Sequence, residues 1–331
     1  MHPIVIKGHE RPVSQLKYNR EGDILISTAR DSLVSVWYAE NGERLGTLQH
    51  EGAVFSVDID SETKLCVTGT TDNSIRFWDL KTGTVVHSTP IEVTARFVEF
   101  SPDMKKLLVV REHQRGKKGA LLIYDIDISD LKAIKTNLKS SIEVTDEEGG
   151  ADAAFVQASW SYDGKHLLTA RKNGKVGRML VETGEFEMEQ KIHDETITDL
   201  QMSPCRSYFV TASRDKYARL VRADTLQVMH SYRGDVPLNT AAITPMKDFI
   251  IAAGGIAARE VTTTSHQKFE SHFFHKLYED DLGRIGGHFG PINTIAVHPF
   301  GIGYCSGSED GYIRLHHFDQ SYFDFDYGSA E

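Results

Sequence analysis

A histidine–aspartate pair at one fixed spacing is the feature of this 331-residue sequence that most restricts its fold. In four pairs the aspartate follows the histidine by 22 residues: His9 and Asp31, His50 and Asp72, His193 and Asp215, His288 and Asp310. Among the 15 histidines of the chain, chance would supply about one such pair. Self-similarity at a fixed period is typical of repeat architectures, so the sequence indicates a repeat protein.

Hydroxyl and aromatic residues recur in the same frame. Four positions before each aspartate stands a hydroxyl residue: Ser27, Thr68, Thr211 and Ser306. Six positions after it come Trp37, Trp78, Val221 and His316, so the tryptophan is kept in two of the four units. A fifth unit keeps the frame with Thr169 and Asn173. Four kinds of position repeating together favour one structural unit used several times.

The distances between the marker histidines count the units. From His9 to His50 the chain advances 41 residues, from His50 to His193 it advances 143, and from His193 to His288 it advances 95. These steps correspond to one, three and two intervals, which makes seven units. Two weaker units fill the long gaps: the third starts near Val98, and the sixth runs from Thr240 to Val261.

Short segments rich in β-formers make up each unit. Between Gly, Asn or Asp turns lie Ile24–Ser27, Val34–Trp37, Ile75–Trp78, Phe209–Ala212 and Tyr312–His316. Such runs are typical of strands, and hardly any segment before residue 260 has the 3.6-residue period of an amphipathic helix. The sequence therefore predicts an all-β chain with four strands in each unit.

Two dipeptide markers connect these units with a known repeat. Gly8-His9 precedes Trp37-Tyr38, and Gln49-His50 precedes Trp78-Asp79. This pattern resembles the WD repeat, whose architecture is the β-propeller. The resemblance predicts a single seven-bladed propeller over residues 1–320, followed by a C-terminal tail at 321–331. The last unit ends after its third strand near Asp319, so we expect the N-terminal strand Ile4–Lys7 to complete the seventh blade and leave no open sheet edge.

In WD repeats the histidine, hydroxyl, aspartate and tryptophan form a hydrogen-bonded polar line across a blade. The resemblance assigns this structural role to His9, Ser27, Asp31, Trp37, His50, Thr68, Asp72, Trp78, His193, Thr211, Asp215, His288, Ser306 and Asp310. The same residue types also make a hydrolase triad, for instance Ser27, His9 and Asp31. However, a nucleophile needs no four copies, and no G-x-S-x-G elbow is present. We therefore expect no catalytic residue and no enzyme activity.

The composition restricts the partners. With 37 Lys and Arg against 47 Asp and Glu, the formal net charge is −10, which argues against direct binding of nucleic-acid phosphates. The longest uncharged apolar run, 249–258, is too short to span a membrane, and the N-terminus shows no secretory signal. Cys66, Cys205 and Cys305 lack metal-ligand spacing and are interpreted as reduced, buried thiols. We expect a cytoplasmic protein.

Candidate ligand motifs are weak. His272, His275 and the pair His316-His317 have no Cys or carboxylate at ligand spacing, which favours scattered polar histidines over a metal site. The glycines between 283 and 290 lack a following Lys-Ser/Thr, so turn glycines are favoured over a phosphate-binding loop. We expect no metal, no cofactor and no small-molecule substrate.

Segments that a propeller does not require give a more specific resemblance. They include His9-Glu-Arg-Pro, Gly287-His-Phe-Gly-Pro-Ile-Asn and Ser308-Glu-Asp-Gly-Tyr-Ile-Arg-Leu-His. Together they resemble the WD-repeat subunit i family of the eukaryotic translation initiation factor 3 complex. The resemblance implies a non-catalytic scaffold that links subunits b and g and supports recruitment of the small ribosomal subunit to messenger RNA and scanning. In that family a C-terminal helical segment of subunit b lies against blades five and six.

A local excess of cations suggests where such a helix would bind. Between Cys205 and Arg233 there are six cations and two anions. The candidate partner-binding residues are Arg206, Arg219, Arg222, Asp224 and Arg233. One hypothesis is a basic face that receives an acidic or amphipathic helix. The alternative is a set of solvated arginines on a blade rim.

Two further segments have open interpretations. Apolar residues of 265–282, among them Phe269, Phe273 and Leu277, fit an elaborated last strand and connector, or else a partner-docking helix. In the tail, Phe323, Phe325 and Tyr327 alternate with aspartates, which fits a strand packed on blade seven or a strand added to a partner.

The fold alone leaves one competing class of function. The same fold serves as a signalling or ubiquitin-ligase adaptor that presents a protein substrate. Such an adaptor is the alternative to the initiation-factor scaffold.

Overall fold

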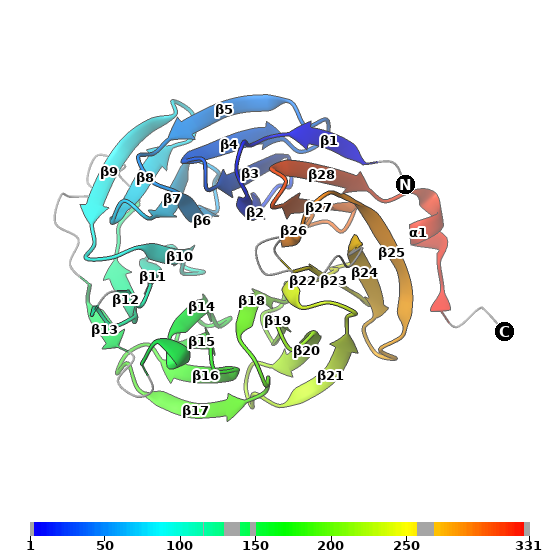
Figure 1. The fold of residues 1–331 in the computed structure, drawn as a ribbon. Coiled ribbons are helices and arrows are strands. Elements are labelled where there is room, and N and C mark those ends of the chain that lie inside the picture. The colour runs from blue at the N-terminus through cyan, green and yellow to red at the C-terminus, as the bar shows by residue number, and fades with distance from the viewer. Residues whose placement is uncertain (1–2, 115, 129–139, 146–149, 257–267, 328–331) are drawn as a thin grey trace.

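Seven four-stranded sheets stand around a common centre (Figure 1). The computed structural model describes residues 3–114, 116–128, 140–145, 150–256 and 268–327. Within each sheet the neighbouring strands run antiparallel. The prediction of an all-β, seven-bladed propeller is confirmed. Among the described residues, no helix has the length and apolarity to cross a membrane.

The strands of each blade follow one another from the centre of the ring to its outside. Blades one and two are β2 (Val13–Tyr18), β3 (Ile24–Ala29), β4 (Leu33–Tyr38), β5 (Arg44–Gln49), and β6 (Val54–Ile59), β7 (Leu65–Thr70), β8 (Ser74–Asp79), β9 (Thr84–Pro90). Blades three and four are β10 (Ala95–Phe100), β11 (Lys106–Arg111), β12 (Ala120–Asp125), β13 (Ile142–Thr145), and β14 (Phe155–Trp160), β15 (His166–Arg171), β16 (Lys175–Leu180), β17 (Phe186–Lys191). Blades five and six are β18 (Ile197–Met202), β19 (Tyr208–Ser213), β20 (Tyr217–Arg222), β21 (Val228–Arg233), and β22 (Leu238–Ile243), β23 (Phe249–Gly254), β24 (Phe269–His275), β25 (Asp281–His288). Blade seven is β26 (Ile292–Val297), β27 (Gly303–Ser308), β28 (Tyr312–His317) and β1 (Ile4–Lys7). A 3-10 helix at Gly150–Ala153 and helix α1 (Gln320–Asp324) complete the described elements.

The N-terminal strand closes the ring. β1 pairs antiparallel with β28, with Ile4 opposite Leu315 and Lys7 opposite Tyr312. Figure 1 shows the blue N-terminal strand lying beside the red C-terminal one. The predicted completion of blade seven by the N-terminal strand is confirmed, and the third strand of this blade is not left as an open edge.

The hydrophobic core lies between the blades. Each of the seven clusters of buried apolar side chains combines residues of two neighbouring blades. Leu65 and Phe77 of blade two, for example, share a cluster with Val98 and Phe100 of blade three. Second strands such as β7 are buried along their whole length, because blades cover both of their faces. A single blade therefore cannot bury its own apolar surface, and the ring depends on contacts between neighbours.

The innermost strand of every blade carries a β-bulge at its second residue. The register shifts between the first and third residues of β2, β6, β10, β14, β18, β22 and β26. A bulge leaves one residue unpaired and turns its side chain out of the ladder. The bulged residues are Ser14, Phe55, Arg96, Val156, Thr198, Asn239 and Asn293.

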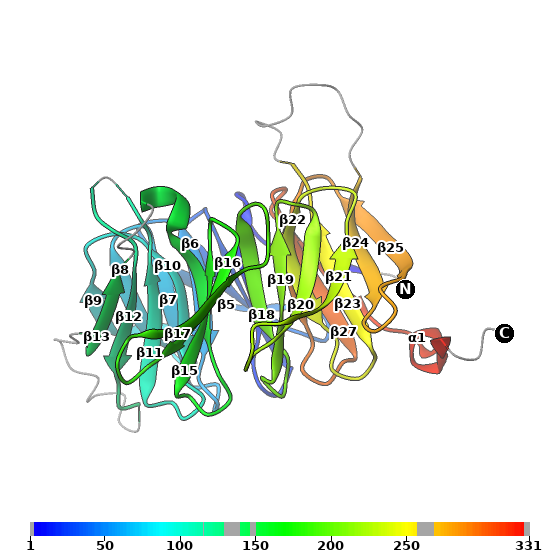
Figure 2. The same ribbon diagram turned by 90° about the horizontal axis from the view of Figure 1, so that it is seen from below.

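The two ends of the ring are distinguished by their turns. We call the end with the turns between second and third strands the aspartate face, since Asp31, Asp72, Asp215 and Asp310 lie there. The connections between blades lie at the same end. Turns between first and second strands, and between third and fourth strands, lie at the opposite face. Figure 2 views the ring from its side, with the strands running between these two ends.

Blade six differs from its expected extent. The sixth unit was expected to end at Val261, which lies outside the described residues, but its third and fourth strands are β24 and β25 and reach His288. The described part of the segment 265–282, residues 268–282, thus supplies strand β24 and the start of β25, and the interpretation as a partner-docking helix is wrong. Between its second and third strands this blade has about ten residues more than blade one, so the repeat period placed the end of the unit too early.

The tail is helical rather than extended. Asp319 caps α1 by accepting a hydrogen bond from the amide of Tyr322. The ring of Tyr322 stacks on Phe318 at 3.7 Å between centroids and meets Phe249 of β23 edge-on at 5.5 Å. The period-two strand predicted here is wrong, because the aromatic contacts of a helical turn hold the tail against blades six and seven. In Figure 1 the helix lies outside the ring, near β25.

Candidate functional site

A continuous line of hydrogen bonds crosses blade one. Nδ1 of His9 donates to Oδ2 of Asp31 at 3.0 Å, while Nε2 accepts from the hydroxyl of Ser27 at 2.7 Å. The indole of Trp37 donates to the same hydroxyl at 2.8 Å. Burial lowers the pKa of His9, although the Asp31 carboxylate works in the other direction. The imidazole is therefore neutral at pH 7, in agreement with this pattern of one donor and one acceptor.

Blades five and seven have the same line without its tryptophan. His193 lies 2.8 Å from both Asp215 and Thr211. In blade seven, His288 lies 3.2 Å from Asp310 and 2.8 Å from Ser306. Val221 takes the tryptophan position of blade five, and in blade seven His316 stacks on Tyr304 with ring centroids 4.4 Å apart. The structure thus brings together the sequence-predicted residues of these two blades.

Blade two departs from the expected line. His50 bonds to Thr68 at 2.9 Å, and Trp78 donates to the same hydroxyl at 3.1 Å. In the described part of the chain no hydrogen bond joins His50 to Asp72. The Asp72 carboxylate instead accepts from Ser74 at 2.5 Å and from Thr70, and it pairs with Arg76 at 2.8 Å.

The reason lies two positions after the aspartate. Ser74 stands where the other lines have Leu33, Tyr217 and Tyr312, and its hydroxyl draws the carboxylate away from the imidazole. Without a carboxylate bonded to it, His50 has a pKa lowered to about 4, with burial as the main cause. Blades one and two both keep all four marker types in the sequence, but only the line of blade two is broken.

The hydroxyl groups of these lines are closed to solvent. Ser27, Thr68 and Thr211 are each 0% exposed, and Ser306 is 1% exposed. Each hydroxyl is also hydrogen-bonded to Nε2 of a histidine, at 2.7–2.9 Å. A nucleophile must reach its substrate, and these hydroxyls have no open side from which a substrate could approach.

The cations between Cys205 and Arg233 do not form one basic face. Arg206 lies in the first turn of blade five and Arg222 at the end of its third strand, so both are at the opposite face. Arg214, Lys216 and Arg233 lie at the aspartate face. The first of the two hypotheses, one basic face, does not fit this arrangement, because the antiparallel meander places consecutive turns at opposite ends of the blade.

Arg219 and Arg222 each pair with an aspartate of their own blade. Nη1 of Arg219 lies 3.1 Å from Oδ2 of Asp215, so this guanidinium belongs to the polar line of blade five. Arg222 pairs with Asp224 at 2.7 Å, and about half of each of these two side chains is exposed. Arg233 is exposed at the end of β21. Arg222, Asp224 and Arg233 are therefore accessible to a partner.

Arg206 reaches into the centre of the ring. Its guanidinium donates to the carbonyl of Trp160 at 2.7 Å and to Glu99 of blade three at 3.1 Å. The Glu99 carboxylate also accepts from the Ser159 hydroxyl at 3.0 Å and from the Trp160 amide at 3.1 Å. Sequence reasoning missed Glu99, which has a recognisable signal: it stands at the fifth position of its first strand, where blade two has Asp58.

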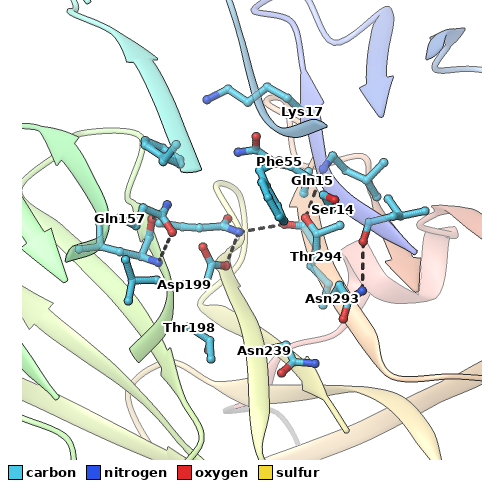
Figure 3. A pocket seen from close by; sticks show the side chains of 18 of the residues that line it. Ser14, Gln15, Lys17, Phe55, Gln157, Thr198, Asp199, Asn239, Asn293 and Thr294 are labelled. Carbon is cyan, nitrogen blue, oxygen red and sulfur yellow. Dashed lines mark hydrogen bonds between the residues drawn. The ribbon is translucent and has the colours of Figure 1, made fainter. Parts of the chain in front are cut away.

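Side chains of the first strands connect every pair of neighbouring blades. Around the central cavity, a side chain on one first strand bonds to the backbone of the next at all seven junctions. Figure 3 shows the side chains of Gln15, Gln157, Thr198, Asn239 and Asn293 around this cavity. The pairs are Gln15 with Val57, Ser56 with Val98, Glu99 with Trp160, Gln157 with Leu200, Thr198 with Leu238, Asn239 with Ile292, and Asn293 with Val13. We call this set the inner belt. It was not predicted, because its members stand at the second, third or fifth position of a first strand and share no single residue type.

The remaining candidates are separated from one another. His272 faces Asp281 at 3.9 Å, His275 packs on Tyr278 and Tyr327, and His316 packs on Tyr304. Within the described residues no cluster of three or more His, Cys, Asp or Glu could hold a metal ion. Of the cysteines, Cys66 and Cys305 are buried, but Cys205 is exposed in a turn, which corrects the expectation of three buried thiols.

The fold and the buried polar lines define the class of protein: this is a WD-repeat β-propeller. Among solved structures, the β-propeller domain of Cps50 (Swd1) from Myceliophteria thermophila superposes with a TM-score of 0.78 over 96% of this chain and 100% of that one, at 16% identity. The EIF3I family model matches residues 1–328. The chain belongs to this family, eukaryotic translation initiation factor 3 subunit I.

Relatives with this name match along nearly the whole chain. The Kluyveromyces lactis protein named eukaryotic translation initiation factor 3 subunit I is 48% identical over 99% of this chain and 95% of its own length. The Botryotinia fuckeliana protein of the same name is 46% identical over 99% of this chain and 97% of its own length. The resemblance stated from the sequence is thereby confirmed at the level of the family.

Proposed function

We propose that this chain is a non-catalytic scaffold subunit of translation initiation factor 3, acting in the cytoplasm. In this role it links subunits b and g, and so supports recruitment of the small ribosomal subunit to messenger RNA and scanning. The observation that carries the proposal is the match to the EIF3I family over residues 1–328. The printed name of the relatives supports membership of that complex, and the identity of the two partners rests on the resemblance of the sequence.

The geometry of the polar lines supports a bracing role without chemistry. Their hydroxyls are buried and bonded, and their imidazoles are held neutral by burial in blades one and five. A buried carboxylate is tolerated when its oxygens are satisfied, as those of Asp31 are by His9 and the amides of Glu10 and Leu33. We assign these residues to holding the turns of each blade in place.

The outer rim of blades five and six offers a surface suited to a helix of subunit b. The turn between β24 and β25 packs on blade five, where Glu279 accepts from His230 at 3.1 Å and Tyr232 donates to the carbonyl of Lys276 at 2.6 Å. Apolar side chains on this rim are exposed, namely Met229, Leu277 and Tyr278 at 43%, 51% and 62%. Exposed apolar groups beside charged ones are what an amphipathic helix requires.

Within this rim we assign the polar contact to Arg222 and Asp224. Both side chains are about half exposed and already oriented by their mutual pairing at 2.7 Å. Arg206 and Arg219 are not part of this contact, since both are engaged inside the propeller. A carboxylate on the partner helix could replace Asp224 as the acceptor of the Arg222 guanidinium.

The first experiment measures the affinity of subunit b by isothermal titration calorimetry. We expect Arg222→Glu to weaken binding of the C-terminal segment of subunit b by about tenfold or more. The matched control is Lys81→Glu, an exposed cation in the corresponding third-to-fourth-strand turn of blade two. If Arg222→Glu and the unaltered chain bind subunit b with equal affinity, this rim is not part of the interface.

The second experiment tests the scaffold role itself. Pull-down with purified subunits b and g should recover both on the full chain, and the chain should sediment with small ribosomal subunits in a sucrose gradient of cell extract. Failure to bind either subunit, or absence from the ribosomal fractions, would contradict the proposal and favour the adaptor class of propeller.

A further inference from the structure

The turn between β24 and β25 has the same backbone geometry as its counterparts in other blades. In blades one, two, four, five and six, the amide four residues after the end of the third strand donates to the carbonyl of the strand's last residue, at 2.8–3.0 Å. The donating residues are Gly42, Gly83, Gly184, Leu226 and Glu279, and their φ values lie between 57° and 73°. Residues can therefore be compared position by position among these five turns.

The turn of blade six differs from its counterparts at its two central positions. Leu277 and Tyr278 occupy them and are 51% and 62% exposed. The corresponding residues of blades one, two, four and five are polar: Glu40-Asn41, Lys81-Thr82, Glu182-Thr183 and Asp224-Thr225. The fold does not require apolar residues here, since four turns of the same geometry do without them. Neighbouring apolar side chains left exposed in this way are typical of a contact with another molecule.

Glu279 ties this turn to blade five. It adopts φ = 65°, in the left-handed region, where blades one, two and four have glycine. A residue with a side chain is strained in this region. Its carboxylate lies 3.1 Å from Nδ1 of His230 and accepts a hydrogen bond from the amide of Ser231, also at 3.1 Å. Both residues belong to β21, so these bonds offset the strain and anchor the turn on the neighbouring blade.

Further bonds hold the backbone of the turn. Nδ1 of His275 accepts from the amides of Leu277 and Tyr278 at 3.2 Å. The hydroxyl of Tyr232 donates to the carbonyl of Lys276 at 2.6 Å. These bonds act on the backbone, and the ring of Tyr278 needs a contact of its own to keep one orientation.

The C-terminal end of the chain supplies this contact. We call residues 319–327 the C-terminal strap. The ring of Tyr327 lies 5.0 Å from that of Tyr278, with 20° between the planes, and 4.5 Å from that of His275. The hydroxyl of Tyr327 donates to the carboxylate of Asp280. Tyr327 therefore contacts both ends of the turn and its exposed ring.

The strap is itself fixed to the propeller before it reaches Tyr327. Besides the contacts of Tyr322 described above, the ring of Phe325 lies 5.9 Å from that of Phe249. The carbonyl of Phe325 accepts from Nζ of Lys247 at 2.9 Å. The strap thus extends from the end of blade seven to the outer turn of blade six, and its position is set by contacts at both places.

We propose that the C-terminal strap positions Leu277 and Tyr278 for the partner at the outer rim of blades five and six, with Tyr327 as the positioning residue. A side chain that is already held in one orientation loses less entropy when it is buried in an interface. The proposal rests on the proposed function, because it takes the helix of subunit b as that partner. It goes beyond that function by assigning a role to the C-terminal tail.

The first test measures hydrogen exchange of residues 276–280 by mass spectrometry, on the full chain without a partner. We expect Tyr327→Ala to accelerate this exchange by about fivefold or more, because the turn loses a contact that opposes its opening. Tyr327→Phe keeps the ring but not the hydroxyl, and its exchange should lie between the two. The matched control is Tyr162→Ala, since Tyr162 is 77% exposed in the first turn of blade four. The control should leave the exchange of the turn unchanged.

The second test measures the affinity of the same variants for the C-terminal segment of subunit b by isothermal titration calorimetry. We expect Tyr327→Ala to raise the Kd by about threefold to tenfold, and Tyr162→Ala to leave it unchanged. Melting curves of both variants should match that of the unaltered chain, because Tyr327 belongs to none of the seven buried apolar clusters.

The two tests separate this proposal from the proposed function. Unchanged exchange in Tyr327→Ala, or faster exchange with an unchanged Kd, would overturn the role of the strap while leaving the rim as the binding surface. Failure of the unaltered chain to bind subunit b would contradict the proposed function and the partner assigned here. The exchange rates test the positioning by Tyr327 without subunit b.

Discussion

Arg206 of blade five and Glu99 of blade three are joined across the centre of the ring at 3.1 Å, although they lie 107 residues apart in the sequence. Arg206 adopts φ = 53°, in the left-handed region, at a turn position where Gly22, Gly164 and Gly301 of other blades have similar positive φ values. An arginine is strained in this region. The strain is offset by bonds that its side chain makes to two other blades.

Removal of this arginine should destabilise the ring. We expect Arg206→Ala to lower the free energy of unfolding by about 1–3 kcal/mol, because the buried Glu99 carboxylate loses its cation but keeps the Ser159 hydroxyl and the Trp160 amide. Urea unfolding followed by circular dichroism measures the change. Arg222→Ala, at an exposed pair, is the control and should unfold as the unaltered chain does. Equal stabilities of the two variants would show that the bond between blades contributes nothing.

Stability should fall as the pH is lowered from 7.5 to 5, with His50 a major cause. Its pKa is about 4 in the folded chain, against about 6.5 for an unfolded histidine. Below pH 6.5 the unfolded chain therefore binds more protons than the folded one, so protonation favours unfolding. The contribution of His50 is about 2 kcal/mol at pH 5.

The variant His50→Gln isolates this contribution. Its stability should depend less on pH than that of the unaltered chain, when both are measured by urea unfolding at several pH values. His317→Gln, at an exposed position, is the control and should keep the full dependence. A pH dependence that His50→Gln leaves unchanged would contradict the assignment.

Closure of the ring can be tested on two adjacent residues of β1. Ile6 packs on the core shared by blades seven and one, whereas Val5 points outward and is 48% exposed. We expect Ile6→Asp to cost about 2–4 kcal/mol, since it places a carboxylate against apolar side chains. Val5→Asp should have little effect. Thermal melting and size-exclusion chromatography distinguish them, and equal melting temperatures would argue against closure by this strand.

The inner belt should also contribute measurably. Gln157 of blade four donates to the carbonyl of Leu200 at 2.7 Å and accepts from its amide at 3.2 Å, so it mimics a strand partner. We expect Gln157→Ala to destabilise the chain by about 1–3 kcal/mol, because both backbone groups of a buried residue lose their partner. Gln190→Ala, on the exposed outer strand of the same blade, is the control. Similar urea midpoints for these two variants would refute a stabilising belt.

The exposed end of the blade-five strands illustrates how far sequence reasoning reaches. Arg222 and Asp224 were identified from charge alone and do lie on the surface, but Arg206, identified by the same reasoning, lies inside. The charges in the sequence do not show at which end of a blade each turn lies, so they do not show which cations share a surface. Similarly, Asp72 carries the correct spacing, but Ser74 decides which group its carboxylate binds.

The number of blades and the closing strand at Ile4–Lys7 could be predicted from the sequence, and so could the strands of the blades that keep the repeat period. These features repeat at a fixed period or alternate locally, and short-range geometry is enough to produce them. The inner belt and the bond from Arg206 to Glu99 could be found only in the folded structure. Both join residues of different blades, and these residues come within bonding distance only after the ring has closed and brought the first strands of separate repeats around one centre.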